Sequence, residues 1–157
     1  MCACNFIWCF DTAMCQRSSA QLILWCLLTL TPALCRADLY IVVNKANSQN
    51  SVTVDQVERI FLLKTKRFEN GDSADPVNQP EGSRARNRFN TQLLRRNEQQ
   101  LKYYWSRKMF SGSDKPPQAL ATDADVEAFV AGKPGGIGYL TVPPQNERVK
   151  TVLTVKE

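Results

Sequence analysis

Five consecutive apolar residues, Leu39 to Val43, constrain the fold of this chain more than any other segment. The run LYIVV is rich in β-branched side chains and places no charge on either face of a strand. A strand with one buried face alternates apolar and polar side chains, whereas a strand covered on both faces reads as a continuous apolar run. The segment therefore predicts a sheet with helices on both sides, as in an α/β domain.

The rest of the chain predicts four helices and three further strands, in one domain that spans residues 38–157. Apolar residues recur every three or four positions in each helix, and two helices open on capping boxes, Thr53–Gln56 and Thr122–Asp125. The expected helices cover 53–64, 84–93, 98–110 and 122–132, and the expected strands cover 39–43, 74–78, 137–140 and 149–155. This order predicts an α/β fold, a single three-layer sandwich with a small mixed sheet. The third helix is expected to bury Leu101, Tyr104 or Trp105, and Met109 or Phe110.

The N-terminal 37 residues predict an export signal. Residues 18–35 carry no charge, Arg17 stands before them, and Cys35 and Ala37 are small. A basic start, a short apolar centre and a small-x-small exit are typical of a secretory signal peptide. We therefore expect cleavage between Ala37 and Asp38, which makes the protein periplasmic or secreted.

The same segment leaves two alternatives open. Its 18 uncharged residues lie at the lower edge of what spans a bilayer, so it can be a retained membrane anchor, although Gln21 and Pro32 weaken that interpretation. The true start is either Met1 or Met14, and in the second case residues 1–13 are an over-extended start.

The distribution of cysteine and histidine excludes several kinds of chemistry. All six cysteines lie within the first 35 residues, and the chain has no histidine. A Cys/His zinc site, a cysteine nucleophile and a Ser-His-Asp triad are therefore excluded from residues 38–157. The acidic clusters are Asp72 with Asp75, and residues 123–127 in a helical first turn, where the helix dipole accounts for them. We expect a protein that is not an enzyme and holds neither a cofactor nor a metal ion.

A basic block lies in the middle of the chain. Eight Lys or Arg residues fall between Arg84 and Lys108, against a single acidic residue, Glu98. Such a block is typical of solvated helix faces or of a surface that binds polyanions. A nucleic-acid groove also needs exposed aromatic rings among the cations, and helical spacing directs Tyr104 and Trp105 toward the core. We therefore expect solvated faces and no nucleic-acid partner.

The segment EGSRAR, residues 81–86, contains the parts of an oxyanion site at the start of a helix. Gly82 lets the backbone approach a ligand, and the amides that follow carry the positive end of the helix dipole. Ser83 adds a hydroxyl, and Arg84 and Arg86 add charge and forked donors. The candidate anion-binding residues are thus Gly82, Ser83, Arg84 and Arg86. The alternative is that Ser83 only caps the helix and Gly82 only makes the turn.

Three stretches together resemble the phosphate-binding proteins of ABC-type phosphate transporters, which belong to the periplasmic binding protein class. They are the strand and helix over 39–64, the PEGS segment over 80–83 with Arg86 and Phe89, and the GKPGGIGY segment over 132–139. The resemblance implies the fold of one lobe of such a receptor, phosphate contacts from Gly82 and Ser83, and ABC transporter membrane subunits as partners.

The sequence departs from the family pattern at several positions. Leu63 stands where the family has glycine, Phe68 where it has tryptophan, and Gln79 where an arginine commonly holds the phosphate. Arg84 and Ala85 replace the Gly-Thr that completes the phosphate loop. We expect Arg84 and Arg86 to substitute for the missing arginine.

The length of the chain matches one lobe, whereas the family closes two lobes over its ligand. A single lobe leaves the anion exposed to water on one side, which weakens charge contacts. Three hypotheses follow: the site is weak, a partner such as a second copy or another envelope protein supplies the other wall, or the lobe is an interaction module that has lost anion binding. In the last case the strand over 149–155 offers an edge for pairing with another chain.

Overall fold

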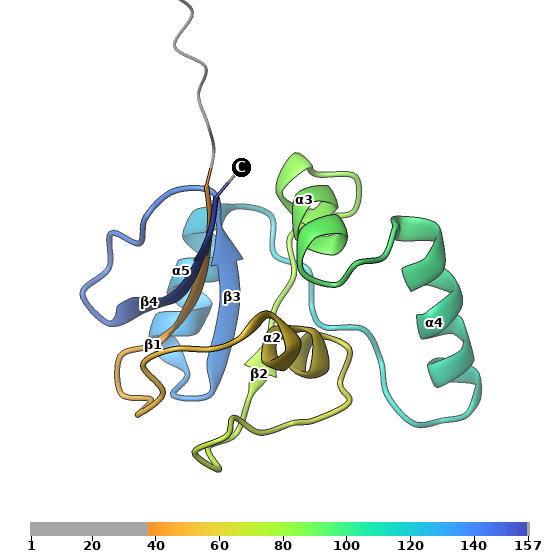
Figure 1. Ribbon diagram of the computed structural model, residues 1–157, viewed down its shortest axis with the longest axis horizontal. Helices are drawn as coiled ribbons and strands as arrows, with labels where there is room; N and C mark the ends of the chain where they lie inside the picture. The colour runs from red at the N-terminus through yellow and green to blue at the C-terminus, as the bar shows by residue number, and fades with distance from the viewer. Residues whose placement is uncertain (1–37, 157) are drawn as a thin grey trace, which may run out of the picture. The chain divides into compact units, whose positions relative to one another are not determined.

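The computed structural model describes residues 38–156, which contain a four-stranded sheet and four helices (Figure 1). The strands are β1 (Leu39–Asn44), β2 (Asp75–Pro76), β3 (Gly136–Leu140) and β4 (Val149–Val155), and the helices are α2 (Val54–Phe61), α3 (Arg84–Gln92), α4 (Glu98–Phe110) and α5 (Asp123–Gly132). The predicted signal peptide lies outside the described residues. Within residues 38–156, no helix is both long enough and apolar enough to cross a membrane.

The sheet is mixed, with strand order β2-β3-β1-β4. The β1 strand pairs antiparallel with both β3 and β4, and β2 runs parallel to β3. The register between β1 and β4 shifts between Ile41 and Val42, which marks a bulge. As the sequence predicted, β4 lies at an edge of the sheet.

The side chains of β1 divide between two apolar clusters, one on each face of the sheet. Ile41 and Val43 belong to the cluster formed with α2 and α3, whereas Val42 belongs to the cluster formed with Val126 and Val130 of α5. Both sets are fully buried, so the continuous apolar run does mark a strand covered on both faces. The three-layer α/β sandwich is therefore confirmed.

Most element bounds agree with the sequence prediction, and the two expected capping boxes are present at Thr53 and Thr122. The strand expected over 74–78 is shorter, because the ladder covers Asp75–Pro76 only and Asn78 then bridges Ala119 instead. Pro76 has no amide hydrogen to contribute to a ladder, which limits pairing there.

The prediction that α4 buries Met109 or Phe110 is wrong. Met109 is 50% exposed and Phe110 is 97% exposed, while Leu101 and Trp105 are the buried residues of this helix. The last turn of α4 meets α2 through a polar group: the Lys108 amine donates to the carbonyls of Leu62 and Leu63 at 3.2 and 3.0 Å. Because Lys108 binds the end of α2, the two apolar side chains that follow it are left in water.

Gly138 of β3 allows α5 to pack closely on the sheet. A Cβ atom at Gly138 would lie 2.5 Å from Val126 Cγ1 and 3.2 Å from Val77 Cγ2. Gly138→Ala is therefore expected to lower the free energy of unfolding by about 1–3 kcal/mol through overpacking. Gly132→Ala is the matched control, since a Cβ atom there meets nothing within 4 Å. Urea denaturation measures both variants, and equal stability of the two would contradict the close packing.

Candidate anion site at the start of helix α3

The chain turns into α3 through Gly82 and Ser83. Gly82 has a φ of 78°, which favours glycine, and a Cβ atom at this position would meet nothing within 4 Å. Ser83 is the N-cap, and its Oγ accepts a hydrogen bond from the Arg86 amide at 3.2 Å. The capping role foreseen for Ser83 is thus present, and the space beside Gly82 is open.

The first turn of α3 also presents unpaired backbone donors. Within residues 38–156, no protein acceptor bonds the amides of Arg84 and Ala85. The Arg84 side chain is exposed. Free first-turn amides, the positive end of the helix dipole and an exposed guanidinium are features that favour an anion at this point.

Arg86, in contrast, points into the protein. The residue is only 7% exposed, and its Nη1 donates to the carbonyl oxygen of Gln79 at 3.1 Å. Its Nη2 lies 3.2 Å from Glu98 Oε1 and 3.7 Å from Glu81 Oε1. The Glu98 contact is an ion pair whose alignment does not meet hydrogen-bond geometry, and the Arg86 Nε has no hydrogen-bond partner among the described residues. Most of the Arg86 charge is therefore matched inside the fold.

The two carboxylates that face Arg86 belong to a network that joins α3 to α4. Glu98, in the first turn of α4, accepts a hydrogen bond from Asn90 of α3 at 2.7 Å. Glu81 also pairs with Lys102 of α4 at 3.4 Å. Neither Glu81 nor Glu98 was singled out from the sequence, because their contact with Arg86 depends on how two helices pack.

Gln79 is buried behind the turn, 6% exposed, and faces β3 and α5. Its side-chain amide donates to Asp123 Oδ1 at 2.5 Å and to the Tyr139 carbonyl at 3.2 Å. Asp123 also accepts from the amide and the hydroxyl of Thr141 at 2.8 and 2.6 Å. The residue that stands in the place of the family's arginine is thus a structural amide in this chain.

Tyr139 completes the support for this segment. Its ring stacks on Phe89 of α3 with centroids 4.1 Å apart, and its hydroxyl oxygen accepts a hydrogen bond from the backbone amide of Gln79 at 3.0 Å. Burial raises the pKa of the Tyr139 phenol above its ordinary value of 10. This phenol therefore stays protonated in the folded protein at a pH where it would ionise in the unfolded chain.

The structure thus places Gly82, Ser83 and Arg84 together at the open start of α3 and turns the Arg86 guanidinium inward, toward α4. Two groups that the sequence analysis did not assign, the carboxylates of Glu81 and Glu98, control the charge of Arg86.

Known structures share this fold. A protein from Clostridium perfringens, described as a phosphate ABC transporter substrate-binding protein with bound phosphate, superimposes with a TM-score of 0.58 at 16% identity, over 74% of this chain and 45% of that one. An ABC-type phosphate transport receptor from Vibrio cholerae gives a TM-score of 0.49 at 18% identity, over 74% of this chain and 46% of that one. No protein-family model matches, and no curated protein matches.

These comparisons define the class of fold. Residues 38–156 adopt a mixed α/β fold that resembles one lobe of the periplasmic binding proteins, and the chain spans less than half the length of the similar structures. At 16% identity, the likeness to the Clostridium perfringens structure establishes the fold alone.

Removing the Arg86 side chain is expected to destabilise the fold. Arg86→Ala would leave Glu98, whose side chain is 24% exposed, without its counter-charge, at a cost of about 2–3 kcal/mol. Arg84→Ala removes the same charge from an exposed position, where a change within about 0.5 kcal/mol is expected. Thermal and urea unfolding compare the two variants, and equal stabilities would show that the Arg86 network does not support the fold.

The raised pKa of Tyr139 predicts a loss of stability at alkaline pH. Above about pH 10 the unfolded chain releases the phenol proton while the folded chain keeps it, so the free energy of unfolding falls as pH rises. Each proton released in this way contributes a slope of about 1.4 kcal/mol per pH unit. Tyr139→Phe should lower stability at neutral pH and flatten this alkaline slope in urea titrations from pH 8 upward. An unchanged slope would contradict burial of a protonated phenol.

Proposed function

We propose that this protein is an exported, non-enzymatic solute-binding protein that recognises inorganic phosphate or a related oxyanion at the start of α3. The observation that carries the proposal is the open Gly82–Ser83–Arg84 turn, with its unpaired amides, on a fold shared with a phosphate-bound receptor. Gly82 admits the anion, Ser83 and the first-turn amides donate to it, and Arg84 supplies the positive charge.

Arg86 belongs to the proposed site in a different way from Arg84. Its Nη1 donates to the Gln79 carbonyl, and its Nη2 pairs with the carboxylates of Glu81 and Glu98. These contacts fix the turn that carries Gly82. Its Nε is buried and has no hydrogen-bond partner among the described residues, so Arg86 contributes to the site through its charge and not through direct contact with the anion. Arg86 therefore positions the turn, whereas Arg84 is the cation proposed to contact the anion directly.

The lobe formed by residues 38–156 leaves the proposed anion open to water on one side. Water screens charge contacts on an open surface, so one lobe alone should bind weakly. We infer that a second wall comes from a partner, either a second copy of the chain or the membrane subunits of an ABC transporter. Cleavage between Ala37 and Asp38 would release the domain to the periplasm or the exterior, where such a partner is met.

Titration with phosphate at low salt, with sulfate as a second ligand, tests the site by calorimetry. We expect micromolar binding. Ser83→Ala and Arg84→Ala should each weaken it by about tenfold, because the first removes a hydrogen-bond donor to the anion and the second removes the positive charge beside it. Thr53→Ala is the matched control, since it removes an equivalent N-cap from α2 at a cost of about 1 kcal/mol without touching α3.

Equal weakening by Thr53→Ala would show that the loss follows from stability rather than from the site. The absence of heat up to millimolar phosphate would instead favour the second candidate, an envelope interaction module of the same fold that has lost anion binding. One observation favours that candidate. The buried cation Arg86 already forms ion pairs with Glu98 and Glu81, so its charge is not free to bind an anion.

A further inference from the structure

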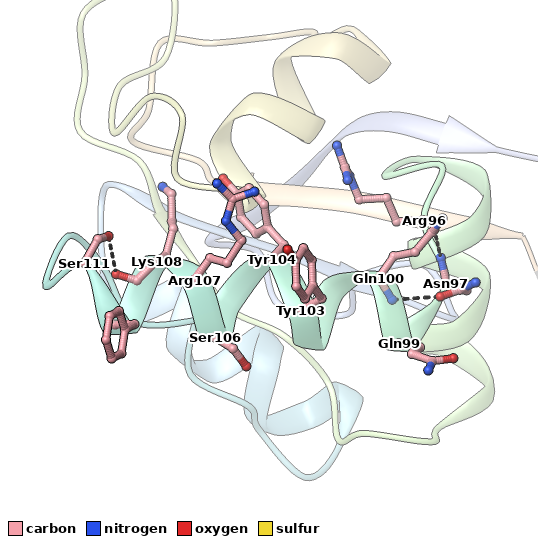
Figure 2. Close-up of a pocket in the computed structure, with 11 residues that line it drawn as sticks. Arg96, Asn97, Gln99, Gln100, Tyr103, Tyr104, Ser106, Arg107, Lys108 and Ser111 are labelled. Carbon is pink, nitrogen blue, oxygen red and sulfur yellow. Dashed lines mark hydrogen bonds between the residues drawn. The ribbon is translucent and has the colours of Figure 1, made fainter.

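A shallow groove of about 1120 Å³ runs along α4, and Figure 2 shows the side chains that line it. All of its lining residues come from one segment, 96–111, and none of them is Gly82, Ser83, Arg84 or Arg86. The groove therefore has to be explained separately from the start of α3.

Exposed aromatic side chains form part of this groove. Tyr103 is 66% exposed and Phe110 is 97% exposed, and both lie on the stripe that Tyr103, Arg107 and Phe110 make at spacings of four and three. Figure 2 shows Tyr103 and Arg107 beside each other on the helix. Large aromatic groups left in water next to arginine have the composition of protein interaction sites.

The charge of the groove is positive and is only partly matched within the described chain. The lining includes Arg96, Arg107 and Lys108 but no Asp or Glu. Lys108 already pairs with Asp114 at 3.3 Å, whereas within residues 38–156 no carboxylate forms an ion pair with Arg96 or Arg107. Two arginines are thus left to face the solvent without counter-charges.

Both arginines are held over tyrosine rings. The Arg96 Cζ lies 5.7 Å from the centroid of Tyr104, and the Arg107 Cζ lies 5.8 Å from the centroid of Tyr103. Tyr104 is itself fixed, because its hydroxyl donates to the Leu62 carbonyl at 2.7 Å. Guanidinium groups laid on rings lose less freedom when they bind, and their forked donors match carboxylates.

We propose that this groove binds an acidic, extended segment of another protein, with carboxylates on Arg96 and Arg107 and an apolar side chain against Tyr103 or Phe110. The guanidinium groups of the two arginines lie over the rings of neighbouring residues, Tyr104 and Tyr103, so the charges stand closer together than the 11 positions between Arg96 and Arg107 would suggest. An extended peptide rises about 3.3 Å per residue, so the two carboxylates that bind them should lie about two to four positions apart.

Two other occupants fit the groove less well. A second copy would bring a like charge, since residues 38–157 hold 18 basic and 14 acidic residues, a net of +4. An anionic membrane would require an apolar helix face to insert, but α4 turns Leu101 and Trp105 inward to the core, and its exposed apolar residues, Met109 and Phe110, are confined to the last turn. An acidic protein segment matches both the unpaired arginines and the exposed rings.

Fluorescence anisotropy with the purified protein tests this proposal. The probe is a labelled synthetic peptide with two glutamates on each side of a phenylalanine, which offers carboxylates about two to four positions apart. We expect micromolar binding, no binding of the same peptide with lysine in place of glutamate, and a loss of tenfold or more in the Arg96→Gln/Arg107→Gln double variant. Tyr103→Ala should weaken the affinity by about tenfold.

The matched control is Arg59→Gln/Arg148→Gln, which removes the same charge from exposed positions outside the groove and should leave affinity unchanged. The proposal is overturned if the acidic peptide does not bind at millimolar concentration, if the lysine peptide binds as well, or if both double variants lose affinity equally. It is also overturned if the groove variants abolish binding to phosphatidylglycerol vesicles or self-association in sedimentation, while peptide binding is unchanged. Phosphate titration should be unaffected by Arg96→Gln/Arg107→Gln, which separates this surface from the α3 site.

Discussion

The buried guanidinium of Arg86 is the interaction on which the arrangement of this domain depends. It contacts the carbonyl of Gln79 before the turn and the carboxylates of Glu81 within it and Glu98 beyond it. The guanidinium of Arg86 thereby joins three successive parts of the chain, which are the approach to α3, α3 itself and the start of α4. A buried charge is tolerated only when its partners are in place, so this contact specifies one geometry for the turn and for the angle at which α4 leaves it.

This constraint also determines which charges remain available at the surface. Glu81 and Glu98 neutralise Arg86, Lys102 pairs with Glu81, and Asp114 pairs with Lys66 and Lys108. The acidic residues near the basic block are therefore already paired. Among the described residues of this block, Arg84 at the open start of α3, Arg95 between the helices, and Arg96 and Arg107 beside α4 form no ion pair with a carboxylate.

The sequence predicted the features that depend on neighbouring residues. The capping boxes at Thr53 and Thr122, the N-cap at Ser83 and the doubly buried β1 are encoded within a few positions, and all four are confirmed. The sequence could not predict the direction of the Arg86 side chain, because its partner Glu98 lies 12 positions away on another helix.

The exposure of Met109 and Phe110 escaped prediction for the same reason. Periodicity alone placed an apolar residue of the last turn of α4 in the core, whereas the tertiary contact uses the Lys108 amine on the free carbonyls at the end of α2. Carbonyl groups at a helix end require donors, and a lysine meets that need better than an aliphatic side chain. The aromatic and basic face of α4 is thus related to how α2 ends. Lys108 and Tyr104 bind that end, Leu101 and Trp105 enter the core, and Tyr103, Arg107 and Phe110 are left exposed. Arg96 and Arg107 form no ion pair within residues 38–156, so we relate this surface to a partner rather than to the stability of the lobe.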